Sequence, residues 1–393
     1  MPPIVEDPAG GEIPLLDLRS QHRQIQAEIL AAIGPLIERQ RFINGPEVAQ
    51  FESGVADYLG VEHAIGVSSG TDALLAVLMA LGVGPDDEVI TTPFSFIATA
   101  EVILRLGARP VFADVSGESC LIRPSAVRKL LTNRTRAIIP VHLYGKVCQM
   151  DEFLDLSAER GIPIIEDCAQ AMGARQNGRA AGSFGLAGAF SFFPSKNLGG
   201  WGDGGMLTTN DAALAHKLRS IREHGADDDM RYSLLGGNFR LDTIQAAVLS
   251  VKLGHLDQWL QARKTAAQYY IQLMVEAGLS AGQNETRHPG HQLLPPPVWD
   301  EPDHAFNLFV VRAERRDALK THLDSAGIGC AVYYPTPLHL QPCFAKLGYR
   351  PGDFPAAEEA ARSVLALPLY PEIGRAQQKR VVEAIAGFYH ARA

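Results

Sequence analysis

The feature that most constrains the fold is an alternation of short apolar runs with amphipathic stretches between residues 64 and 209. The stretches between the runs, such as 71–81, 95–106 and 150–160, place apolar residues at helical spacing. Strands that helices cover on both faces read as continuous apolar runs. We therefore predict an α/β domain with a largely parallel sheet between helices. The predicted strands are AIGV, EVITT, PVFADV, AIIPVHLYG, PIIED, GAFSFF and GMLTT.

Helices are predicted on either side of this alternating region. One covers residues 20–40, and a second begins at Pro46, where a missing amide proton costs nothing, and ends at Gly60. A long helix over residues 241–276 leads out of the sheet domain.

The C-terminal third has a different pattern. Residues 288–304 are rich in proline and glycine and are predicted to be irregular. Three elements follow, a strand at FNLFVVRA, a helix at Arg316–Ala326 and a strand at GCAVYY. We predict a large α/β domain over residues 1–250, which includes the N-terminal helices, and a smaller α+β domain over residues 251–393.

Composition excludes several classes of function. The 36 Lys and Arg against 44 Asp and Glu leave a net charge of −8, which argues against a general nucleic-acid surface. The longest apolar stretch, residues 73–84, is too short to cross a membrane, and the acidic, proline-containing leader does not resemble an export signal. The 5 cysteines have no metal-site spacing. We predict a cytoplasmic protein with reduced thiols, no metal site and no membrane segment.

A glycine turn lies between a predicted strand and a predicted helix, in VSSGTDALL. The free amides of a helix N-terminus attract anions, and Gly70 and Thr71 would let a phosphate come close. Simple capping of the helix by Ser69 or Thr71 is the alternative.

Two further residues have positions that suit chemistry. Asp167 follows a buried strand directly, in the region where α/β proteins bind ligands, although such an acid often only caps a helix. Lys196 lies on a loop among small residues, and a lysine can form a Schiff base with a carbonyl cofactor. Gly200, Gly202 and Gly205 fit G-x-G-x-x-G, but a strand follows them, which excludes a dinucleotide site.

Together the three elements match the three contacts that pyridoxal 5′-phosphate (PLP) requires. The turn at Gly70 would hold the phosphate, Asp167 would face the pyridine nitrogen, and Lys196 would make the covalent link. An acid beside the ring nitrogen favours its protonated form, which makes the ring an electron sink.

Ordered motifs over nearly the whole chain resemble the DegT/StrS sugar aminotransferases, which have the aspartate aminotransferase fold (PLP fold type I). The resemblance implies that Lys196 holds PLP, that Asp167 pairs with the ring nitrogen and that Gln170 lies near the phenolic oxygen. It also implies that Gly70, Thr71 and Ser191 bind the phosphate. The motifs include FINGPEVAQFE, SSGTDAL, TTPFSFIATA, PVHLYG, IIEDCAQA, SFFPSKNLGGWGDGG, GGNFRLDTIQAAVL and YYPTPLHLQPCF.

The resemblance also suggests an aromatic residue and a partner subunit at the site. Phe94 falls where relatives stack a flat side chain on the pyridine ring, whereas the neighbouring Phe96 is the better core candidate. Asn238 matches an asparagine that reaches the phosphate of the neighbouring subunit, which implies a homodimer with shared active sites. Gly237 departs from the tyrosine that many relatives have there, and this leaves substrate detail open.

Three residues match positions near the substrate in relatives. Arg240 would contact the substrate or pair with a nearby carboxylate, and the two readings are equally supported. Tyr334 and His339 fall where related enzymes contact the sugar nucleotide, and a packing role is nearly as well supported for each.

The resemblance implies transfer of an amino group from L-glutamate to a nucleotide-linked keto-hexose. YYPTPLHLQPCFAKLGY favours amination at carbon 3, with carbon 4 as the alternative. A PLP-dependent sugar dehydratase would have a histidine in place of Lys196, which disfavours that activity. A non-catalytic PLP-binding regulator on the same fold is a third reading.

Overall fold

The computed structural model describes residues 11–227, 229–281, 292–295 and 303–391. The prediction for the leader therefore lies partly outside the described residues, as does much of the predicted irregular stretch 288–304. Within that stretch, Leu293–Leu294 forms a short strand, β10, because it pairs with a neighbouring strand. No helix in the described part of the chain is both long and apolar enough to span a membrane.

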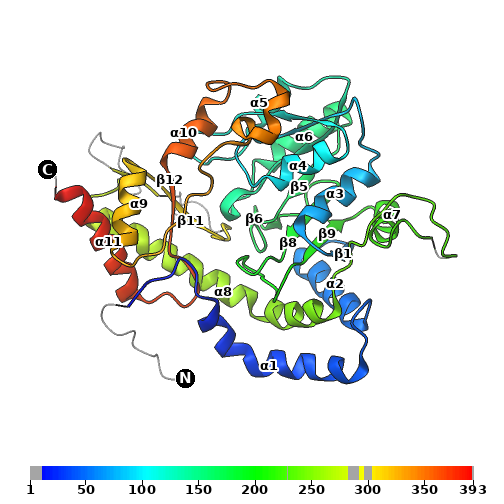
Figure 1. Ribbon diagram of the computed structural model, residues 1–393, viewed down its shortest axis with the longest axis horizontal. Helices are drawn as coiled ribbons and strands as arrows, with labels where there is room; N and C mark the ends of the chain where they lie inside the picture. The colour runs from blue at the N-terminus through cyan, green and yellow to red at the C-terminus, as the bar shows by residue number, and fades with distance from the viewer. Residues whose placement is uncertain (1–10, 228, 282–291, 296–302, 392–393) are drawn as a thin grey trace.

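A mixed, largely parallel sheet forms the centre of the larger part of the molecule (Figure 1). Two groups of strands, β3-β2-β4 and β1-β9-β8-β5, are joined by parallel bridges between Ile138 and Ile164 and between Val141 and Asp167. Of these strands, β9 alone runs antiparallel to its neighbours. The predicted α/β layers are confirmed. The strands are β1 His63–Val67, β2 Glu88–Thr91, β3 Arg109–Phe112, β4 Thr135–Ile139, β5 Ile165–Asp167, β8 Ala187–Ser191 and β9 Gly205–Thr209.

Helices cover both faces of this sheet, because alternate strand residues point to opposite sides. Ala189 packs in a core with α3, α4 and α7, whereas its neighbour Phe190 packs in a core with α2 and α8. The helix α6 covers the sheet beside β4. The bounds are α2 Pro46–Leu59, α3 Gly70–Ala80, α4 Ala98–Arg105, α5 Pro124–Arg128, α6 Met150–Arg160, α7 Ala212–Arg222 and α8 Thr243–Glu276, with a small hairpin of β6 Arg175–Gln176 and β7 Arg179–Ala180.

Local signals explain where the first helices begin and end. Helix α1, Leu18–Arg39, begins two residues before the predicted start, because the Asp17 side chain accepts the N–H groups of Arg19 and Ser20. Helix α2 begins at Pro46 and ends at Gly60, whose φ of 68° suits glycine. The predicted bounds of α2 are thus confirmed.

The C-terminal part has an antiparallel sheet with helices, as predicted. Its strands are β10, β11 Phe309–Ala313 and β12 Val364–Leu367, and its helices are α9 Arg316–Ser325, α10 Pro355–Ser363 and α11 Arg375–His390. The strand predicted at GCAVYY is wrong. Only Ala331 makes a bridge there, to Ala366, since β12 fills the place beside β11.

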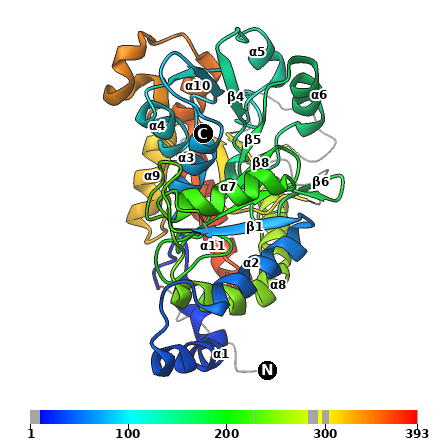
Figure 2. The ribbon, with the colours of Figure 1, turned by 90° about the vertical axis from the view of Figure 1, so that its right-hand side faces the viewer.

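The long helix α8 connects the two parts (Figures 1 and 2). The predicted boundary between residues 250 and 251 falls inside it, and the helix packs on α1, α2 and α11. Ile13, which the prediction placed in the large domain, pairs with Ile328 and packs in the C-terminal core. The exact division into domains stays a prediction.

Candidate active site

A cavity of about 650 Å³ opens at the carboxyl ends of the parallel strands. Ser69 follows β1, Asp167 ends β5, and Ser191 ends β8, and all three line the cavity. Strands that run in the same direction bring these ends together, which is why α/β proteins bind ligands there. Of the residues predicted for the site, the cavity brings together Gly70, Thr71, Asp167, Gln170, Ser191, Lys196 and Tyr334.

One corner of the cavity is the N-terminus of α3. Ser69 caps the helix, because its Oγ accepts the N–H of Asp72 at 3.0 Å. A Cβ atom on Gly70 would lie 2.8 Å from the Cβ of Ser191, so only glycine allows the first turn to lie this close to β8. The amides of Gly70 and Thr71 open a helix whose dipole favours an anion. This corner fits a phosphate group.

Asp167 lines a second, enclosed part of the cavity. The residue is only 5% exposed. Its carboxylate accepts the Thr99 hydroxyl at 2.7 Å and the Ala169 N–H at 3.1 Å. Burial raises the pKa of Asp167, while these hydrogen bonds and the charge of Lys196 act to lower it. The carboxylate is held in one orientation, which suits a partner for a ring nitrogen.

The sheet end behind Asp167 is fixed by a buried carboxylate. Glu166 accepts the N–H groups of Gly182, Phe184 and Gly185 at 2.7–2.8 Å. It also contacts Nε2 of His142 at 2.9 Å, and Nδ1 of that ring accepts the Cys148 N–H. The ring therefore carries its hydrogen on Nε2. His142, Glu166 and Cys168 lie within 4.8 Å of one another, but these contacts already occupy the imidazole and the carboxylate. The cluster therefore supports the end of the strand.

Lys196 projects into the cavity from the loop that follows β8. Burial lowers the pKa of Lys196 to about 8, although nearby Asp167 acts to raise it. A larger share of the amine is neutral near neutral pH than in an exposed lysine, and the neutral amine is the nucleophile.

The loop around Lys196 is tightly held. Asn197 donates its side-chain N–H to the Ala305 carbonyl at 2.9 Å, and the buried Lys252 donates to the Gly199 carbonyl at 2.6 Å. A Cβ on Gly199 would lie 2.2 Å from the carbonyl oxygen of Pro194, so the turn requires glycine. These contacts fix the point from which Lys196 reaches the cavity.

Gln170 and Tyr334 form a linked pair on another wall. The side-chain oxygen of Gln170 accepts the Tyr144 N–H at 2.7 Å, and its nitrogen donates to the Tyr334 hydroxyl at 3.1 Å. Because both residues line the cavity, Tyr334 is placed where a ligand could touch it.

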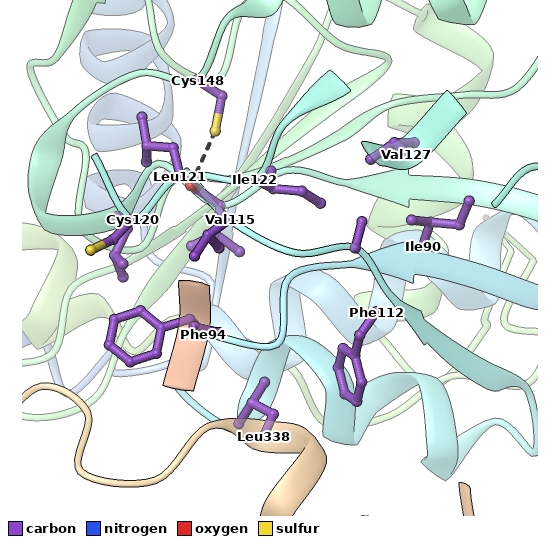
Figure 3. Close-up of a cluster of buried hydrophobic side chains, with 14 of the residues drawn as sticks. Ile90, Phe94, Phe112, Val115, Cys120, Leu121, Ile122, Val127, Cys148 and Leu338 are labelled. Atoms are coloured by element: carbon purple, nitrogen blue, oxygen red, sulfur yellow. Dashed lines mark hydrogen bonds between the residues drawn. The ribbon is translucent and has the colours of Figure 1, made fainter. Parts of the chain in front are cut away.

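The two phenylalanines of the TPFSF segment have exchanged the roles that were predicted. Phe94 is fully buried and packs in the core with Val115 and Cys120 (Figure 3). Phe96 is 57% exposed and lines the cavity. The chain turns directly after β2, where the Phe94 N–H donates to the Thr92 hydroxyl, and this turn directs Phe94 inward. The prediction that Phe94 lies at the cavity and Phe96 in the core is wrong.

Three other predicted residues lie outside this cavity. His339 is 2% exposed, contacts Glu358 at 3.2 Å and packs on Phe354, so in this chain it has the packing role. Arg240 donates to the Glu223 carboxylate at 2.9 Å. Pairing with a nearby carboxylate was the predicted alternative to contact with the substrate. Asn238 is exposed and pairs with Glu223 through the backbone.

Other cavity residues gave no sequence signal strong enough to single them out. Thr99 lies within a predicted helix, and Asn307 lies within the strand predicted at FNLFVVRA, although the observed β11 begins two residues after it. The adjacent Leu15 and Leu16 line the cavity from the leader, far away in sequence. The sequence feature that could have pointed to Leu15 and Leu16 is that two leucines stand side by side in a polar leader.

The arrangement fits PLP on its geometry. An anion corner, a fixed carboxylate and an amine of lowered pKa surround one cavity, and these are the phosphate, ring-nitrogen and covalent contacts of that cofactor.

Comparison with known proteins gives one family over nearly the whole chain. Residues 23–386 match the model of the DegT/DnrJ/EryC1/StrS aminotransferase family. The "Pleiotropic regulatory protein" of Geobacillus stearothermophilus is 45% identical over 377 residues, which cover 96% of this chain and 98% of that protein.

A further relative carries an enzyme name, and a solved structure superposes on this chain. A "UDP-N-acetyl-3-dehydro-alpha-D-glucosamine 3-aminotranferase" from Acidithiobacillus ferrooxidans is 42% identical, with 96% of this chain and 98% of that protein covered. The crystal structure of S. venezuelae DesV, in complex with a ketimine intermediate, superposes with a TM-score of 0.90 at 40% identity. That match covers 96% of this chain and 99% of the DesV chain.

Proposed function

The chain belongs to the DegT/DnrJ/EryC1/StrS aminotransferase family, and we propose that it uses PLP to transfer an amino group from L-glutamate to a nucleotide-linked keto-sugar. One observation carries this proposal. A single cavity joins Lys196, Asp167 and the anion corner at Gly70, in the arrangement that PLP requires. The Acidithiobacillus relative, which is 42% identical, bears the name of a sugar-nucleotide 3-aminotransferase, and this name supports the class of acceptor.

Each part of the cofactor has residues that would hold it. Gly70, Thr71 and Ser191 would bind the phosphate, Asp167 the ring nitrogen and Gln170 the phenolic oxygen. Phe96, which lines the cavity, replaces Phe94 in the proposed stacking role. When bound, PLP supplies an aldehyde carbon for the covalent link and a ring that accepts an electron pair.

Lys196 would move the proton in both halves of the reaction. Its amine has a pKa of about 8, so Nζ can take a proton and return it near neutral pH. Asp167 would stay ionised beside a protonated ring nitrogen, because a positively charged neighbour lowers the pKa of a carboxyl group. Leu15, Leu16 and Leu369 line the same cavity and would exclude water from it.

The acceptor carbon is proposed to be carbon 3. The name of the Acidithiobacillus relative specifies a 3-aminotransferase, and the YYPTPLHL segment favours the same branch. Amination at carbon 4 is the alternative.

We propose that the working unit is a homodimer with shared active sites. Asn238 is exposed and lies outside the cavity of its own chain, where it would be free to reach a neighbour. The same segment exposes Met230 by 70%, Tyr232 by 66% and Leu235 by 88%. Large apolar side chains gathered on one exposed segment are typical of an interface.

A regulatory role is a second candidate, because the Geobacillus relative bears a regulatory name. Glutamate separates the two candidates. An aminotransferase loaded with PLP loses the absorbance of its lysine-bound cofactor when glutamate is added, whereas a sensor that lacks turnover keeps it with every amino acid.

The acceptor is identified in the reverse direction. The protein is incubated with PLP, 2-oxoglutarate and a panel of dTDP- and UDP-linked 3-amino and 4-amino sugars, and glutamate is measured. We expect glutamate from a 3-amino sugar nucleotide. Glutamate from none of the panel would contradict the proposed acceptor class.

A further inference from the structure

Asn307 lies in the wall of the cavity, and its side-chain oxygen has no hydrogen-bond partner among the described residues. The residue is only 7% exposed and lines the cavity together with Lys196 and Gln170. Its Oδ1 atom is enclosed and has no hydrogen-bond partner within the described part of the chain. Buried polar atoms are nearly always paired, because an unpaired one carries a free-energy penalty. A ligand in the cavity can supply the missing partner.

The backbone around Asn307 is held on both sides. Ala305 donates its N–H to the Gly145 carbonyl at 2.9 Å, and its own carbonyl accepts the Asn197 side chain at 2.9 Å. Gly145 has a φ of 101°, and a Cβ there would lie 3.0 Å from the backbone nitrogen of Asn307. The segment is therefore packed against the loops that carry Lys196 and Tyr144. These contacts fix the backbone position from which the Asn307 side chain extends.

The bonding capacity of the amide indicates what it binds. An asparagine side chain offers an acceptor and a donor group side by side. A carboxylate of the amino donor only accepts, so it would leave Oδ1 unpaired. A sugar hydroxyl both donates and accepts, so it can satisfy the amide. The cavity residues Leu308, Phe309, Val332 and Leu367 are apolar, so the Asn307 amide adds a polar group to a wall that is partly apolar.

We propose, on the basis of the function proposed above, that Asn307 binds a hydroxyl group of the acceptor sugar and orients the keto carbon toward Lys196. Asn307 then serves the sugar half of the reaction and leaves the glutamate half unaffected. A residue that bound glutamate would instead affect the glutamate half of the reaction and leave the sugar half unaffected.

The test compares the two half-reactions in Asn307→Leu, which keeps the size of the side chain and removes both bonding functions. The sugar probe is the panel member with which the wild-type protein forms glutamate. We expect the sugar half-reaction to slow by about tenfold or more, with binding of the same nucleotide sugar weakened to a similar extent in calorimetry. The loss of cofactor absorbance with glutamate should keep its wild-type rate. Asn307→Ser, which retains a hydroxyl, should recover part of the sugar rate.

Thermal unfolding of the ligand-free protein gives an independent readout. Leucine removes an unpaired buried amide, so Asn307→Leu should melt at the same temperature as the wild type or higher. A lower melting temperature would assign Asn307 a structural role and overturn the proposal. Slowing of the glutamate step, equal slowing of both steps or no slowing of either would also overturn it. If the wild type forms no glutamate from any panel member, the proposed function itself fails, which is a different result.

Discussion

Replacing Thr99 by valine tests whether one buried hydroxyl keeps Asp167 in the state that a ring nitrogen needs. Thr99 is 1% exposed, and its hydroxyl donates to the Asp167 carboxylate at 2.7 Å. Burial raises the pKa of Asp167, and the Thr99 hydrogen bond is the first of the influences that lower it. Valine has nearly the same shape without the donor, so the change removes little else.

The size of the effect follows from this single contact. A hydrogen bond to a charged group contributes about 1.5–3 kcal/mol. In Thr99→Val the ionised form of Asp167 loses this stabilisation, so more of the carboxyl is protonated in the cofactor-free protein and must lose its proton before it pairs with a protonated ring nitrogen. At about 1.4 kcal/mol for each tenfold change, PLP affinity should fall, with about 10- to 150-fold as the upper limit because the same hydrogen bond also exists without PLP.

The assay measures noncovalent PLP binding by fluorescence quenching in a Lys196→Ala background, so that the covalent link does not mask the change. Thr99→Ser is the matched control, because it keeps the hydroxyl and should retain most of the affinity. If valine and serine at this position bind PLP equally well, the hydroxyl does not support Asp167 and the reasoning is refuted.

Three further predictions concern the same cavity. Lys196→Ala should abolish turnover and keep the melting temperature, and measurable turnover of glutamate by the variant would contradict the role of the lysine. The rate at which PLP links to the apoprotein should rise with pH through a midpoint near 8, because the pKa of Lys196 is lowered to about 8 and the amine reacts only when neutral; stopped-flow absorbance would show a midpoint above 10 if burial had no effect. Gly70→Ala should lower the free energy of unfolding by about 1–3 kcal/mol through overpacking, because the added Cβ would lie 2.8 Å from that of Ser191. Gly84→Ala is the control: its added Cβ would have nothing within 4 Å, so thermal unfolding should be unchanged.

The sequence by itself determined the layers and predicted the residues that are proposed to hold the cofactor. Apolar runs of strand length and helical periodicity are local signals, so the α/β order was readable along the chain. Gly70 lies in the turn after a predicted strand, Asp167 comes at the end of another, and Lys196 lies on the loop after a third. Because parallel strands end at one edge of a sheet, their meeting in one cavity followed from the fold class.

Tertiary packing alone decided which neighbouring side chain faces the cavity. Phe94 and Phe96 are two residues apart and chemically identical, and the turn after β2 sends the first into the core and the second to the cavity. His339 and Arg240 likewise find Glu358 and Glu223 as partners. These choices depend on contacts that the periodicity of the sequence does not show, such as the packing of Phe94 in one core with Val115 and Cys120.

The same limit applies to the residues that the sequence did not single out. Thr99 meets Asp167 across 68 positions of the chain, and Asn307 reaches the cavity from the connection between α8 and β11. A threonine in a helix and an asparagine before a strand have no periodicity that marks them. Local sequence patterns specify the elements and their caps, whereas the site also depends on contacts that exist only after those elements have packed together.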